Sequence, residues 1–214
     1  MPQLRKYTLQ NRTCYVYHPV NGQYFFDEGC YRFYLNRLFN CLRAYGLQLH
    51  TYALLPAEKH LLFSVFSTGG LQRLLDAVDA SYDEYFHNRF GRRPVTGDRR
   101  IRAVTGGNLA LDCQKFIELA PVRTGLATIP GDYPWSGYCV NALGGHGRGV
   151  TRHEQYQRFC GQSPTPFQAY RDYISSPFTP EQLRFLEQRL ISGFPLVARP
   201  TATAHRGLQA GSAT

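Results

Sequence analysis

The sequence predicts an α+β protein: a ferredoxin-like sandwich with helices packed on one face of an antiparallel sheet, plus a C-terminal helical extension. Two observations predict this class. The expected elements follow the order strand, helix, two strands, helix, strand up to Val104, and a short turn at Pro56 makes the two middle strands an antiparallel pair. With 214 residues, 43% of them hydrophobic and 14% aromatic, the chain can bury an ordinary core in one main domain with an appendage.

Strands are expected where apolar and β-branched residues alternate or cluster between turn signals. The first such segment, CYVYHPV, alternates along its whole length. The expected strands are Cys14–Val20, Leu47–Leu55, Lys59–Phe66 and Arg100–Val104.

Helices are expected where apolar residues recur every three to four positions between a capping residue and a glycine or proline. Asp27 is a suitable N-cap for the first helix, and Gly46 is its stop. The second helix opens at Gly69 and Gly70 and ends near Gly91. Further helices are expected over 108–119, 151–161, 165–174 and from the Thr179 cap to about residue 192.

Composition divides the chain into four segments. The main domain covers 1–141, and the glycine-rich stretch ALGGHGRG indicates a linker over 142–150. A helical extension follows over 151–197, and the polar, small-residue tail 198–214 is expected to be disordered.

The chain has no sign of a membrane or secretory segment. No apolar run approaches the roughly 20 residues of a membrane helix, and the polar start lacks the apolar core of a signal peptide. We therefore expect a bacterial-type cytoplasmic protein with no membrane contact. The six cysteines form no CxxC pair, so they are expected to be reduced core residues and not zinc ligands or disulfides.

The charge balance favours a polyanionic partner. The formal net charge is +9 and the pI about 9.4, although charge alone leaves a nucleic-acid partner and no partner equally open. Arginine suits bidentate contact with phosphates and with guanine edges, and six arginines lie within the 14 residues RFGRRPVTGDRRIR. They are Arg89, Arg92, Arg93, Arg99, Arg100 and Arg102, and the alternative interpretation is a solvated charged loop.

The segment Leu54–Phe66 carries the first candidate for chemistry. Glu58 and His60 are two residues apart on an expected strand, so both side chains leave the same face. A lone histidine at the start of an apolar strand is usually a surface residue or a satisfied core residue, so the pair by itself is a weak signal.

The surrounding sequence resembles the single-tyrosine HUH transposases, most closely the branch associated with repetitive extragenic palindromes. LHTYALLPAEKHLLFSV resembles that family's strand with two histidines. Four other segments match in the same order as in the family: YVYHPVNGQYFFDEGCYRFYLNRL, SYDEYFHNRFGR, FIELAPVRTGL and DYPWSGY. The resemblance covers about residues 15–138 and implies an HUH-type core, binding to hairpin-forming single-stranded DNA, and a bacterial origin.

The resemblance also implies a degenerate catalytic site. In such enzymes a tyrosine on a helix attacks a DNA phosphate beside a divalent metal. The metal is held by two histidines and by a polar residue four positions after the tyrosine. The second histidine corresponds to His60 and the first to Glu58, while the tyrosine falls on Phe116 and the third ligand on Ala120. Phe116 has no hydroxyl and Ala120 cannot coordinate, so no catalytic residue is expected. No cofactor should be required, and Mg²⁺ or Mn²⁺ should bind weakly at best through His60 and Glu58.

Arg100 and Arg123 fall on arginine positions of the family, so Arg123 joins the candidate DNA contacts. The sequence thus predicts a catalytically inactive DNA-binding protein that acts on hairpin or repeat DNA as a regulator or accessory factor. One alternative is an active nickase and transposase with an unusual metal site or with a nucleophile relocated to Tyr82, Tyr85 or Tyr133. A second is a protein-interaction module on an inherited fold.

Overall fold

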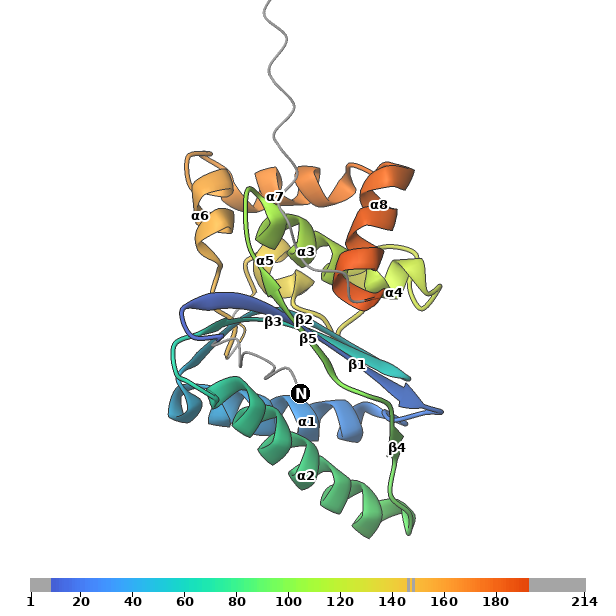
Figure 1. The fold of residues 1–214 in the computed structure, drawn as a ribbon. Coiled ribbons are helices and arrows are strands. Elements are labelled where there is room, and N and C mark those ends of the chain that lie inside the picture. Colours follow the sequence, from blue (N-terminus) through green and yellow to red (C-terminus); the bar gives the residue numbers. More distant parts are fainter. Residues whose placement is uncertain (1–8, 146, 148, 193–214) are drawn as a thin grey trace, which may run out of the picture.

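The computed structural model describes residues 9–145, 147 and 149–192, so the predicted tail 198–214 lies outside the described residues. A twisted antiparallel sheet forms the middle layer, with helices on both of its faces (Figure 1).

The sheet is built around its first strand. Its described strands are β1 (Arg12–Asn21), β2 (Leu47–Leu55), β3 (Glu58–Val65), β4 (Val95–Thr96) and β5 (Arg100–Val104). The order is β2-β3-β1, and β1 pairs on its other side with both β4 and β5. The predicted strands are present. β4 was not predicted, because two residues are too short to show an alternating pattern.

The described helices include the six predicted ones, in the predicted order, and two short helices at 120–123 and 138–143 that were not predicted. They are α1 (Glu28–Cys41), α2 (Gly70–Phe90), α3 (Leu109–Glu118), α4 (Ala120–Arg123), α5 (Tyr138–Leu143), α6 (Glu154–Cys160), α7 (Pro166–Ser175) and α8 (Pro180–Leu186), which continues as a π-helical turn over Glu187–Ser192. Asp27 caps α1 as predicted, since its side chain accepts a hydrogen bond from the Cys30 amide at 3.1 Å. A 3₁₀ turn after α1 ends at Gly46, whose φ of 66° lies in the left-handed region.

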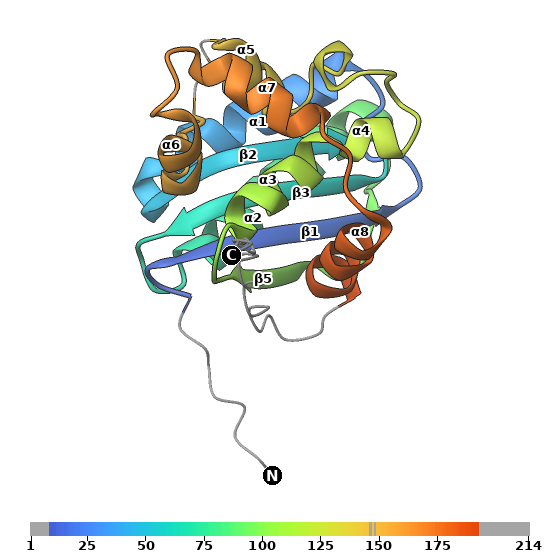
Figure 2. The ribbon, with the colours of Figure 1, turned by 90° about the horizontal axis from the view of Figure 1, so that it is seen from above.

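Helices α1 and α2 pack on one face of the sheet, as the ferredoxin-like prediction requires (Figure 1). The opposite face is also covered, by α3 and the C-terminal helices (Figures 1 and 2). Strand alternation serves both layers, because Cys14 and Val16 face α1 and α2 while Tyr15 faces α3. The predicted arrangement, with helices on one face of the sheet alone, therefore holds only for the first half of the chain.

The segments just before and after α5 run along the outer edge of β2. Thr151 donates its amide to the Leu49 carbonyl at 2.7 Å, and Gly137 donates to the Tyr52 carbonyl at 2.8 Å. Helices α6 and α7 then pack on α3 and α5 through a cluster of buried residues. Its members are Leu111, Tyr138, Ala142, Tyr156, Cys160, Tyr170 and Ile174.

None of the helices within the described residues is long and apolar enough to cross a membrane. All six cysteines are free thiols. Four of them are buried, as predicted for core residues, whereas Cys41 and Cys139 are only partly buried.

Candidate nucleic-acid interface

The four positions that correspond to catalytic residues lie together on the sheet face that α3 covers. Glu58 and His60 project from β3, Phe116 from α3, and Ala120 begins α4. His60 Nε2 is 3.2 Å from Glu58 Oε1, and the rings of His60 and Phe116 are 6.4 Å apart. The two-residue spacing therefore places Glu58 and His60 side by side, as predicted.

Two tyrosines of β1 complete this cluster. The Tyr15 hydroxyl lies 2.6 Å from His60 Nδ1, and Tyr17 donates its hydroxyl to Glu58 Oε2 at 3.0 Å. His60 is only 1% exposed. Burial favours the neutral acid, but contacts with His60 and Tyr17 outweigh it and lower the pKa of Glu58, so the carboxylate is charged. Sequence reasoning missed both tyrosines, because only the β1–β3 register brings them beside His60.

The donor set does not fit a catalytic divalent metal. Glu58 and His60 offer two ligands, and the described residues contain no group of three His, Cys, Asp or Glu side chains that could hold a metal. The space where a third ligand would lie is apolar, since Phe116 and Ala120 pack with Leu186 of α8. Without a third ligand a divalent ion would be poorly held.

The tyrosines proposed as relocated nucleophiles are held elsewhere. Tyr82 and Tyr85 belong to α2, on the opposite face of the sheet (Figure 1). Tyr82 donates to the Tyr24 carbonyl at 2.7 Å, and Tyr133 donates to the Leu54 carbonyl at 2.6 Å.

The phenols near Glu58 are not activated either. Burial, followed by the nearby Glu58 carboxylate, raises the pKa of Tyr17 to about 12. Burial likewise raises the pKa of Tyr15 well above its ordinary value. Both phenols therefore stay protonated at neutral pH and are poor nucleophiles.

The arginine-rich segment does not form one continuous charged surface. Arg89 makes two hydrogen bonds to Asp27, at 3.0 and 2.6 Å, and so ties α2 to the cap of α1. Arg99 pairs with Asp76 and Asp79, each at 2.8 Å. These two arginines connect elements of the fold.

Arg100, Arg102 and Arg123 belong to the face that α3 covers. Arg100 donates to the Ile191 carbonyl at 2.6 Å and lies 5.8 Å from the ring of Tyr17. Arg102 is partly buried beside it on β5. Arg123 lies 3.9 Å from the centre of the Phe116 ring and donates to the Phe116 carbonyl.

Arg92 and Arg93 remain available to a ligand. Both are exposed, and among the described residues neither forms an ion pair or a side-chain hydrogen bond. The Arg92 guanidinium lies over Phe26, at 5.4 Å, and Phe26 is itself 38% exposed. Together with the exposed Val95, these residues form what we call the α2-end patch: Arg92, Arg93, Phe26 and Val95. It combines free cations with apolar surface.

The fold is like that of the HUH transposases. One pair of helices covers one face of a five-stranded antiparallel sheet, and a third helix crosses the other face. A solved structure that shares this fold is a REP-associated tyrosine transposase bound to a REP hairpin, with a TM-score of 0.55 and 13% sequence identity over 72% of this chain and 93% of that chain. The predicted HUH-type fold is thus confirmed. No family model and no curated protein sequence matches the chain. The tRNA(His) guanylyltransferase from Saccharomyces cerevisiae aligns over 87% of this chain and 82% of that chain at 12% identity, but its TM-score is only 0.42.

Proposed function

We propose that the chain is a DNA-binding protein derived from a single-tyrosine HUH transposase, and that it binds hairpin DNA without cleaving it. The observation that carries the proposal is the combination of a transposase fold with Phe116 and Ala120 at two of its chemical positions. The structural neighbour is bound to a REP hairpin, which supports hairpin DNA as the ligand class.

The α2-end patch is the surface that we assign to DNA. Free guanidinium groups contact phosphates, and exposed apolar side chains beside them contact sugars and bases. Arg89 and Arg99 flank the patch and hold it in place through Asp27 and Asp79. Because their charges are already paired within the protein, we assign them a positioning role.

The biological role that follows is that of a regulator or accessory factor at hairpin or repeat DNA, acting in the cytoplasm of a bacterium. We expect binding to require no metal, since Glu58 and His60 offer only two ligands, 3.2 Å apart.

Fluorescence anisotropy with a labelled hairpin tests the proposal. The variant Arg92→Ala/Arg93→Ala should bind more weakly than wild type. The matched control Arg37→Ala/Arg184→Ala removes two exposed arginines from α1 and α8 and should bind nearly as well as wild type. Equal binding by both double variants would remove the patch from the proposal. Absence of wild-type binding at low salt would instead favour a protein-interaction module.

A further inference from the structure

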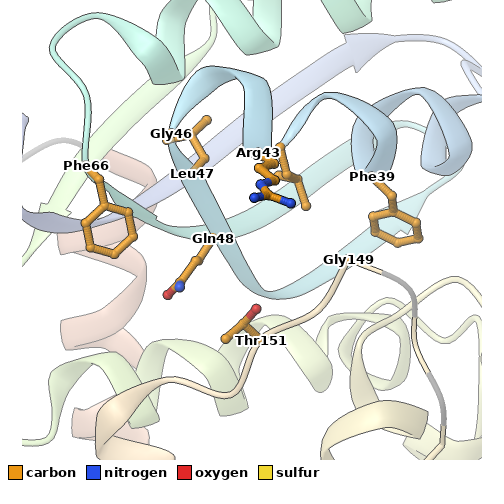
Figure 3. A pocket seen from close by; sticks show the side chains of 9 residues that line it. Phe39, Arg43, Gly46, Leu47, Gln48, Phe66, Gly149 and Thr151 are labelled. Atoms are coloured by element: carbon orange, nitrogen blue, oxygen red, sulfur yellow. The ribbon is translucent and has the colours of Figure 1, made fainter.

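A serine and a histidine lie against each other beside a cavity, away from the four degenerate catalytic positions. Ser64 of β3 and His50 of β2 both line this cavity, which has a volume of about 540 Å³. Gln48 and Thr151 line it too, and they also line a neighbouring cavity of about 390 Å³, which Figure 3 shows. A cavity of this size can hold a small molecule beside the Ser64 hydroxyl.

The contacts of His50 define the roles of its two ring nitrogens. Nδ1 lies 2.6 Å from the Thr151 carbonyl oxygen, which can only accept a hydrogen bond, so Nδ1 carries the proton. Burial lowers the pKa of His50 to about 4, so the ring is neutral at physiological pH and Nε2 keeps its lone pair. Nε2 lies 2.8 Å from Ser64 Oγ and therefore accepts the serine hydroxyl. A serine that donates to an oriented, neutral imidazole has the arrangement of an activated nucleophile.

A β-bulge gives His50 this position. The register of β2 against β3 shifts between Leu49 and Thr51, so His50 is the extra residue of β2 and has no partner in β3. Bulges re-aim side chains and are over-represented next to active sites. The His50 ring lies 4.7 Å from the ring of His153, which caps α6. The bulge therefore directs His50 toward the layer that contains α6 and places its Nε2 beside Ser64.

Gln48 is placed to stabilise negative charge next to Ser64. The two residues pair directly across β2 and β3, which sets their Cβ atoms about 5 Å apart on one face of the sheet. The exposed Gln48 side chain forms no hydrogen bond with any residue that the structure describes, so its amide N–H groups are available. Side-chain amides of this kind stabilise the oxyanion that forms during acyl transfer.

Most of the charged side chains that line the cavity are engaged within the protein. These side chains are Arg12, Arg152 and Glu154. Glu154 pairs with Arg158 at 3.2 Å, and the Arg152 guanidinium lies 4.9 Å from the centre of the Phe167 ring. Exposed Arg12 has no ion pair among the described residues. The groups next to Ser64 are uncharged, since His50 is neutral and Gln48 is an amide, so a neutral substrate fits beside the serine.

We propose that Ser64 and His50 form a catalytic pair that hydrolyses small, neutral carboxylic esters. Ser64 Oγ attacks the carbonyl carbon as its proton passes to His50 Nε2, and the Gln48 amide donates to the oxyanion that forms. Collapse of this intermediate breaks the ester C–O bond. The alcohol leaves with the proton from His50, and the acyl group stays on Ser64. Water then attacks the acyl group, gives its proton to His50 and releases the acid. This activity needs no metal and does not depend on the proposed binding of hairpin DNA.

Covalent labelling tests the pair directly. A fluorophosphonate should form an Oγ–P bond at Ser64 with loss of HF, and peptide mass spectrometry should locate the adduct there. Ser64→Ala should give no adduct at this position, and His50→Gln should slow labelling by about 10² or more because the general base is lost. The matched control is His153→Gln, which removes a second buried imidazole that contacts Thr13 at 2.9 Å and not Ser64. It should label at nearly the wild-type rate.

Hydrolysis of 4-nitrophenyl acetate gives the second measurement. Wild type should exceed Ser64→Ala, and the difference is the rate that the pair supplies. Gln48→Ala should lower kcat for this part of the rate by about 10²–10³ and leave KM nearly unchanged, as expected for a donor to the oxyanion. Because Gln48 is exposed, this variant tests the proposal even if His50→Gln does not fold.

Two results would overturn the proposal. One is the absence of a phosphonyl adduct on wild-type Ser64. The other is equal hydrolysis by wild type, Ser64→Ala and Gln48→Ala when circular dichroism shows that all three are folded. Neither assay contains DNA, so such results would leave the proposed function intact. Loss of hairpin binding by wild type would likewise leave the Ser64–His50 pair intact.

Discussion

Phe116 and Ala120 are the residues on which our proposal that the protein does not cleave DNA rests. The side chain of Phe116 has no hydroxyl, and its ring lies against the Arg123 guanidinium. Restoring a phenol alone would not restore an enzyme, because no third ligand would position a metal beside it.

Phe116→Tyr is therefore expected to form no covalent adduct with a suicide single-stranded DNA substrate in the presence of Mg²⁺ or Mn²⁺. The combined variant Phe116→Tyr/Ala120→Asn/Glu58→His is the one in which nicking should return. Denaturing electrophoresis and mass spectrometry detect the adduct. A tyrosyl adduct on the wild-type protein, at any tyrosine, would show that the proposal of inactivity is wrong.

The same donor count predicts weak metal binding. Calorimetry of wild type with Mn²⁺ should give no micromolar site, because Glu58 and His60 supply only two ligands. A micromolar site that disappears in His60→Ala would instead indicate a working metal centre and favour the nickase alternative.

Glu118 is a buried carboxyl group that joins three elements to α3. Its oxygens accept hydrogen bonds from Thr51 of β2 at 2.6 Å, Asn141 of α5 at 2.8 Å and Tyr170 of α7 at 2.9 Å. Burial nevertheless outweighs these contacts and raises the pKa of Glu118 to about 7.

This shift makes stability depend on pH. The folded protein holds the Glu118 proton up to about pH 7, whereas the unfolded chain releases it near the ordinary value of 4.5. The contribution is complete below pH 4.5 and is lost as pH rises through 7, for a total of about 3 kcal/mol. Urea unfolding should show wild type losing stability by about this amount relative to Glu118→Gln between pH 5 and pH 8. Parallel curves for the two proteins would contradict the shifted pKa.

At the scale of elements, a buried ion cluster fastens α2 to the sheet. Lys59 of β3 is 1% exposed and lies 2.7 Å from Asp79 of α2, which also contacts His18 and Arg99. The Lys59 ammonium additionally lies 4.4 Å from the Tyr24 ring. Removing the central acid would leave a buried cation without compensation.

Asp79→Ala is accordingly expected to lower the free energy of unfolding by about 3–5 kcal/mol. The control Arg32→Ala removes an exposed ion pair with Glu28 on α1 and should change stability by no more than about 1 kcal/mol. Urea denaturation of both variants measures the difference. Similar small losses in both would mean that the cluster around Asp79 adds little to the packing of α2.

At the scale of the whole molecule, the arginines that contribute to the net charge of +9 differ in whether their charges are already paired within the protein. Arg89, Arg99, Arg100 and Arg123 make hydrogen bonds or ion pairs within the protein, whereas Arg92 and Arg93 make none with the residues that the structure describes. Total charge therefore overstates the charge that a DNA ligand can meet.

The salt dependence of hairpin binding measures that available charge. Each phosphate contact adds about −0.9 to the slope of log affinity against log salt on duplex DNA, and about −0.7 on single strands. Arg92→Ala/Arg93→Ala should flatten the slope by up to twice the amount that one phosphate contact adds. Arg37→Ala/Arg184→Ala should leave it nearly unchanged. Identical slopes in the two double variants would mean that the α2-end patch does not lie on phosphates.

The sequence by itself predicted the longer strands and helices and the residues at the four candidate chemical positions. The Asp27 cap, the Gly46 stop and the Pro56 turn act on their own neighbours in the chain, so local patterns suffice to predict α1, β2 and β3. Phe116 lacks a hydroxyl and Ala120 lacks a ligand atom, so the sequence alone leads to the prediction that the family's chemistry is absent.

Only the tertiary structure decided which arginines are free and which faces of the sheet are covered. Arg89 finds its partner 62 positions away at Asp27, and Tyr15 reaches His60 across 45 positions. Such contacts depend on strand register and helix packing, and no local pattern encodes them. The same reason explains why the second helical layer and the Ser64–His50 pair became visible only in the folded molecule.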